Sequence, residues 1–145
     1  MSIEMSVLSD NSLSSTAEWQ RALDTEGFLL KLDADVILSE AKGFFPAQFR
    51  ERPTGFEVYH DDAAEMIADN PRFDFGKPWK HALGFRVGGN FTELYAAFMA
   101  ATAYARATGG IVWDGESGEL MSPDRAAQVT HDIERDCAEQ IARGA

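Results

Sequence analysis

The chain has 145 residues, of which 45% are hydrophobic and 26% are charged. These proportions are ordinary for one globular domain and exclude a disordered chain or a coiled coil. The net charge of −11 comes from 13 Lys and Arg residues against 24 Asp and Glu residues. Such an acidic chain is unsuited to binding nucleic acid or an anionic membrane surface. We expect residues 1–145 to form a single domain.

The sequence carries no sign of export or of membrane insertion. Its one cysteine, Cys137, excludes an internal disulfide framework and a site built from several thiolates. The first ten residues contain no basic residue and no apolar run, so they do not resemble a signal peptide. The most apolar stretch, Leu94–Ala105, is too short to cross a bilayer. We therefore expect a soluble, cytoplasmic protein.

Alternation and capping residues predict the elements of the N-terminal third. Apolar and polar residues alternate through Ile3–Val7, which predicts a strand with one buried face. A helix is expected between the cap residue Ser15 and Gly27. The apolar run Phe28–Leu32 predicts a second strand, and residues 36–43 favour an irregular or strand segment.

The middle of the chain reads as a hairpin followed by a short helix and a loop. Strands are expected over Phe45–Arg52 and Gly55–His60, with the turn at the Pro and Gly residues between them. Asp62 with Glu65 forms a capping box that opens a helix through about Asp69. An aromatic-rich loop, Phe73–Lys80, follows.

The C-terminal half combines short strands with two longer helices. Leu83–Val87 alternates like a strand, and Asn90 caps the helix that contains Leu94–Ala105. That stretch has no charge on any face, so it should be packed on more than one side, with Phe98 and Ala101 buried. Short strands are then expected at 111–114 and 119–121. A last helix follows, with a buried stripe of Val129, Ile133, Cys137 and Ile141.

This order of elements predicts an α+β fold. Hairpins are interspersed among the helices, which do not alternate strictly with strands. We expect a largely antiparallel sheet with helices packed on one face.

Few residues in the chain have the pattern of a chemical site. His60, Asp61 and Asp62 could hold a metal or exchange protons, but Asp62 is already explained as a helix cap. Gly88-Gly89 precedes a helix, where backbone amides can hold phosphate, yet the pattern has neither the later glycine of a dinucleotide site nor the lysine of a P-loop. No nucleophile, base and oxyanion hole assemble. We expect no catalytic residue, no metal and no cofactor.

Charge and aromatic residues point instead to a surface for a protein partner. The short helix and its start carry several acids, and the loop after it carries several aromatic rings, a combination found at interface hot spots. These rings could equally cover the sheet edge or fill the core. The residues predicted to contact a partner are Asp61, Asp62, Glu65, Asp69, Phe75 and Trp79.

Three segments resemble parts of small bacterial immunity-type proteins. They are Thr54–Tyr59, Leu83–Gly89 with the alanine-rich helix after it, and Thr108–Asp114. The resemblance covers about the second half of the chain and rests on apolar pattern and glycines. It implies a protein that binds and blocks a secreted antibacterial toxin without catalysis. The shared residues are structural, so the resemblance assigns no site residue.

Two classes of function remain open from the sequence. The first is a non-catalytic protein-binding domain of the immunity type, whose partner would be a basic toxin domain. The second is a small enzyme or ligand-binding domain that uses His60 and Asp61 together with the cleft near Gly88-Gly89.

Overall fold

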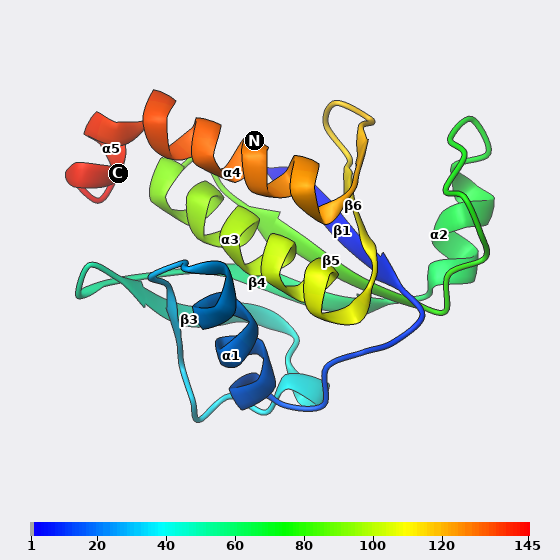
Figure 1. Cartoon of the computed structure of the whole chain (residues 1–145), viewed down its shortest axis with the longest axis horizontal. Coiled ribbons are helices and arrows are strands. Elements are labelled where there is room, and N and C mark those ends of the chain that lie inside the picture. The colour runs from blue at the N-terminus through cyan, green and yellow to red at the C-terminus, as the bar shows by residue number, and fades with distance from the viewer. Residues whose placement is uncertain (1) are drawn as a thin grey trace.

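A seven-stranded antiparallel sheet forms the centre of the molecule (Figure 1). The structure is a computed structural model that describes residues 2–145. The strand order is β2-β3-β4-β5-β1-β6-β7, so the first strand of the chain lies inside the sheet. The strands are β1 (Ile3–Ser9), β2 (Lys31–Leu32), β3 (Gly43–Phe49), β4 (Arg52–Asp61), β5 (His81–Val87), β6 (Ile111–Asp114) and β7 (Leu120–Met121).

Three helices cover one face of this sheet. In Figure 1, α3 (Phe91–Thr108) runs between α1 (Thr16–Glu26) and α4 (Pro123–Asp136). The short elements are η1 (Leu38–Glu40), α2 (Ala63–Asp69) and α5 (Ala138–Ala142). The fold is therefore α+β, as expected. None of the helices in residues 2–145 is long and apolar enough to span a bilayer.

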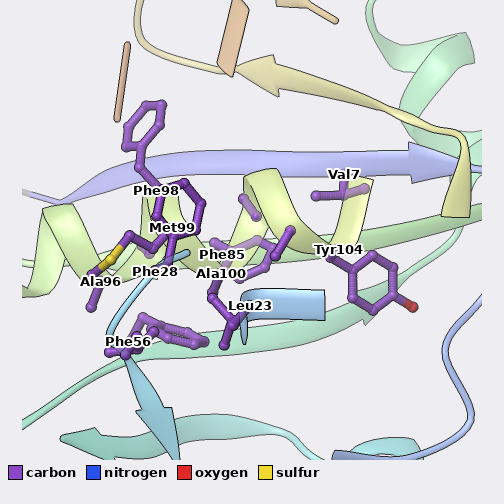
Figure 2. Close-up of a cluster of buried hydrophobic side chains, with 14 of the residues drawn as sticks. Val7, Leu23, Phe28, Phe56, Phe85, Ala96, Phe98, Met99, Ala100 and Tyr104 are labelled. Carbon is purple, nitrogen blue, oxygen red and sulfur yellow. The ribbon is translucent and has the colours of Figure 1, made fainter. Parts of the chain in front are cut away.

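The main core lies between the sheet and α3. Figure 2 shows Phe56 and Phe85 from the sheet in one cluster with Met99 and Ala100 of α3. Trp19 of α1 is fully buried, and its indole nitrogen donates a hydrogen bond to the carbonyl of Ala100 at 3.0 Å. Because every residue from Tyr95 to Ala105 is buried, α3 is packed on more than one side, as its lack of charge indicates.

A second, smaller cluster lies on the opposite face. Leu8 and Ala82 are cross-strand neighbours that alternate with the core residues Val7 and Leu83, so they point to the other side of the sheet. Ala63 of α2 packs with them there. This cluster covers only part of that face, and no helix of residues 2–145 covers the remainder toward β3 and β4.

Local capping chemistry is confirmed at every helix where it was predicted. Ser15, Asp62 and Asn90 each accept a hydrogen bond from the amide three residues later. Gly27 and Gly109 end α1 and α3 in the left-handed conformation. These signals need only a few neighbouring residues, which explains why the sequence reveals them.

The predicted turn between β3 and β4 is wrong by several residues. The turn lies at Arg50-Glu51, whose φ values are 53° and 64°, and Pro53 and Gly55 belong to β4. Two-residue hairpin turns need positive φ, which usually selects Asn or Gly. Arg and Glu are not typical of such turns, so the sequence at Arg50-Glu51 does not indicate one. Gly55 has a different role: a side chain there would overlap the carbonyl of Phe45 and the ring of Phe44.

Three further expectations are corrected. The strand predicted at Phe28–Leu32 shrinks to Lys31–Leu32, because Phe28 and Leu30 enter the core from a loop. Residues 36–43 contain the 3₁₀ helix η1 in place of a strand. The last helix breaks at Cys137 into α4 and α5, although Ile141 is still buried as the stripe indicates.

Candidate functional site

Four carboxylates form an acidic surface at the end of β4 and along α2. This acidic surface consists of Asp61, Asp62, Glu65 and Asp69, all of which are exposed. Asp62 caps α2, and its Oδ1 accepts a hydrogen bond from the amide of Glu65 at 3.1 Å. Glu65 and Asp69 are four residues apart, so they are neighbours on the surface of the helix.

None of these four carboxylates forms an ion pair within residues 2–145, although Lys80 and His81 line a second hollow with Asp61 and Asp62. Elsewhere several acids form ion pairs: for example, Arg106 pairs with both Glu26 and Asp124. Unpaired charge of one sign on a short helix and at the end of the strand before it creates a local negative field. This surface is therefore suited to attract a cationic group.

The aromatic loop after α2 has a structural role. Phe75 is only 5% exposed, and its ring centroid lies 5.3 Å from that of Trp113 on β6. Phe73 also packs edge-on against Trp113. Trp79 is half-buried, and its indole nitrogen donates to the carbonyl of Phe75 at 2.7 Å. These rings cover the sheet, so Phe75 is not presented to a partner, while Trp79 keeps a partly accessible ring.

A hollow of about 540 Å³ lies on the uncovered part of the sheet face, beside the acidic surface. We call it the sheet hollow. It is floored by small residues of the central strands and walled by larger ones from β1, β4, β5, β6 and α2. Its lining includes Glu4, Tyr59, Asp61, Gly84, Arg86 and Trp113.

Asp61 belongs to both the acidic surface and the sheet hollow. Its carboxylate lies over Gly84, where a Cβ atom would overlap it, so glycine at this position leaves room for the acid. The carboxylate has neither a hydrogen bond nor an ion pair within the part of the chain that the structure describes. Loss of solvent, and to a smaller extent the nearby charge of Glu4, raise the pKa of Asp61.

The opposite wall of the hollow already holds one cation between a carboxylate and a ring. Arg86 donates two hydrogen bonds to Oε1 of Glu4, at 2.7 and 3.0 Å. Its guanidinium carbon lies 5.8 Å from the centroid of the Tyr59 ring. The Tyr59 hydroxyl donates to Glu57, and this hydrogen bond is the main reason that the pKa of Tyr59 is raised.

The metal or acid–base site considered at His60-Asp61-Asp62 does not assemble. The three side chains diverge: His60 Nε2 lies 2.9 Å from the carbonyl of Leu38, Asp61 lies over Gly84, and Asp62 caps α2. Within residues 2–145, no three His, Cys, Asp or Glu side chains converge as a metal site would require.

The glycine pair at 88–89 lies far from this histidine. His60 pairs with Leu83 at one end of β5, whereas Gly88 follows Val87 at the other end. Five steps along a strand separate Leu83 from Gly88, which is about 16 Å. One site therefore cannot use both features, and the geometry does not support the alternative that combined them.

Sequence reasoning identified Asp61 but missed the other walls of the hollow. Tyr59, Arg86 and Trp113 are far apart in the chain, and they meet because β4, β5, β1 and β6 are neighbours. One local signal was present: Gly84 lies between the buried Leu83 and Phe85. A glycine inside a strand marks close approach of another group.

Comparison with known proteins assigns no family to the chain, since no family model matches its sequence and no curated protein is similar to it. The resemblance to immunity-type proteins therefore stays a prediction. Function has to be argued from the acidic surface and the sheet hollow.

Proposed function

We propose that this protein is a non-catalytic protein-binding domain whose acidic surface docks on a basic protein partner. The observation that carries the proposal is the group of exposed carboxylates on α2 and at the end of β4, none of which forms an ion pair within the described part of the chain. A secreted toxin domain with a basic face is the partner class we propose, which would make the chain an immunity-type inhibitor acting in the cytoplasm. The resemblance of residues 54–59, 83–89 and 108–114 to such proteins supports this choice.

Charge of this kind acts mainly on the rate of association. A negative surface attracts a positive partner over about a Debye length, which is roughly 8–10 Å at physiological salt. The net charge of −11 adds to the same long-range attraction. Removing surface charge should therefore slow association and weaken its dependence on salt, with a smaller effect on dissociation.

Reversal of charge on α2 tests the proposal. The chain is used to capture its partner from the native organism, and the rates are then measured by surface plasmon resonance at two salt concentrations. Glu65→Lys with Asp69→Lys should lower the association rate by about tenfold at low salt. Both side chains are exposed, and neither lines the sheet hollow.

A matched control separates this surface from the net charge of the molecule. Glu51→Lys with Glu139→Lys changes the total charge equally, at exposed acids in the β3–β4 turn and on α5. We expect this control to slow association much less. If the α2 variant keeps the rates of the unchanged protein, or if both variants slow association equally, the acidic surface is not the docking surface.

A further inference from the structure

The sheet hollow contains one carboxylate with a cation and one without. Glu4 is paired with Arg86, whose guanidinium also lies over the ring of Tyr59. Asp61, on the other side of Tyr59 along the same strand face, has no partner among residues 2–145. The hollow thus repeats the elements of a cation site, namely a carboxylate next to an aromatic ring, without the cation.

The local charge balance favours a cationic ligand. The carboxylates of Glu4 and Glu57 lie near the single guanidinium of Arg86, and Asp61 adds a third carboxylate on the other wall of the hollow. An anionic ligand would meet this excess of negative charge at short range. A metal ion would find too few converging ligands in the described chain. A monovalent organic cation reduces this negative excess and needs only one carboxylate.

The shape of the walls favours a planar cation. Tyr59 and Trp113 both line the hollow, and a guanidinium can lie flat against an aromatic ring while it donates two hydrogen bonds to one carboxylate. The floor at Gly84 lacks a side chain, so a ligand can approach the backbone there. The volume of about 540 Å³ is ample for one long side chain.

We propose that the sheet hollow is the anchor site for the partner and that it receives an arginine side chain, which pairs with Asp61 and lies against Tyr59 and Trp113. This inference rests on the proposed function, because it assigns the contact that holds the same basic partner after the acidic surface has attracted it. A buried anchor of this kind mainly sets the dissociation rate.

A titration with Nα-acetyl-arginine amide tests the site without the partner. Two-dimensional nuclear magnetic resonance follows the Trp113 indole N–H and the Gly84 amide of the full chain. We expect saturable shifts at both groups at millimolar ligand. Nα-acetyl-citrulline amide has nearly the same shape but no charge, and it should bind about tenfold more weakly, as a loss of one charge-assisted pair predicts.

Two variants complete the test. Asp61→Asn should weaken binding of the arginine amide by about tenfold, whereas Asp69→Asn, which removes a charge from the same acidic surface outside the hollow, should leave it within about twofold. The inference is overturned if the citrulline amide binds as tightly as the arginine amide, or if Asp61→Asn leaves binding of the arginine amide unchanged. It is also overturned if the shifts are confined to residues other than Trp113 and Gly84.

The kinetics with the captured partner distinguish this inference from the proposed function. Asp61→Asn should raise the dissociation rate by about tenfold and change association little, whereas the Glu65 and Asp69 reversal acts on association. If reversal slows association but Asp61→Asn leaves dissociation unchanged, the acidic surface stands and the hollow is not the anchor. If the arginine amide binds but reversal has no effect on association, the proposed docking surface fails and the hollow is only a site for free cations.

Discussion

At the scale of single residues, Asp61 is the clearest sign that part of this surface is not optimised for stability. A carboxylate that loses part of its solvent and gains no hydrogen bond or cation raises the free energy of the folded state, by a small amount here because Asp61 stays exposed. Glycine at position 84 keeps the space that the carboxylate occupies. A residue that costs stability in the free protein is a reasonable candidate for a role in binding.

The first prediction concerns this cost and its dependence on pH. In the folded protein the pKa of Asp61 lies above its ordinary value of 3.8, because desolvation and the charge of Glu4 on β1 raise it by more than His60 on β4 lowers it. The folded protein therefore holds the proton of Asp61 more tightly than the unfolded chain does. The stability that Asp61 contributes is therefore fully present below pH 3.8 and is lost as the pH rises through the raised pKa. Asp61→Asn should stabilise the protein at pH 7 by about 0.5 kcal/mol.

Urea unfolding of both proteins at pH 7 and at about pH 3.5 measures this effect. The gain should shrink at the lower pH, where the carboxyl group is mostly protonated in both states. Asp69→Asn serves as the control, since Asp69 is exposed on α2. A loss of stability at pH 7 on Asp61→Asn would mean that the carboxylate has a favourable contact in the folded protein.

At the scale of elements, α3 organises the fold because its alanines allow close approach from three sides. Ala96, Ala97, Ala100, Ala101 and Ala105 have no exposed surface. Neighbouring helices are also fixed by polar contacts: the Thr102 hydroxyl lies 3.2 Å from that of Thr130 on α4, and Trp19 on α1 donates to the carbonyl of Ala100. A helix held in this way tolerates neither a void nor an added side chain.

The second prediction follows from this packing. Phe98→Ala should lower the free energy of unfolding by about 3–5 kcal/mol, because it leaves a cavity. Ala101→Leu should lower it by about 1–3 kcal/mol, because no space is free around that residue. The matched control is Ala107→Leu at an exposed position of the same helix, which should change stability by about 0.5 kcal/mol at most. Midpoints of urea unfolding that are equal for Ala101→Leu and Ala107→Leu would contradict this account.

The sequence predicts these elements best where the deciding interaction is local. Caps such as Asn90 and the apolar faces of the strands depend on residues a few positions apart, and they were predicted correctly. The turn at Arg50-Glu51 was missed because the pairing of β3 with β4, and not residue preference, imposes positive φ there.

The sheet hollow depends on strand order: β1 lies between β5 and β6, and no local pattern contains that information. The role of Phe75 was ambiguous for the same reason, since its neighbour Trp113 lies on a distant strand.

At the scale of the whole molecule, the sheet separates two hydrophobic units of unequal size. The main core joins α1, α3 and α4 to one face, while the smaller unit places α2 and the aromatic loop on the other. A helix of seven residues is not stable without tertiary contacts, so α2 depends on a small cluster that includes Ala63 and Phe75. This arrangement places most of the acidic surface on the less stable unit.

The last prediction is that α2 opens independently of the main core. Hydrogen exchange in the native state should show a lower opening free energy for the α2 amides, such as that of Met66, than for the central amides of α3, with little dependence on denaturant. Phe98→Ala provides the decisive comparison. It should lower the opening free energy of the α3 amides by about 3–5 kcal/mol, since these exchange through global unfolding. The α2 amides should be unaffected, because Phe98 keeps its contacts in both the closed and the locally open state. If the two sets of amides lose protection together, α2 opens only with the entire molecule, and the acidic surface is as rigid as the core beneath it.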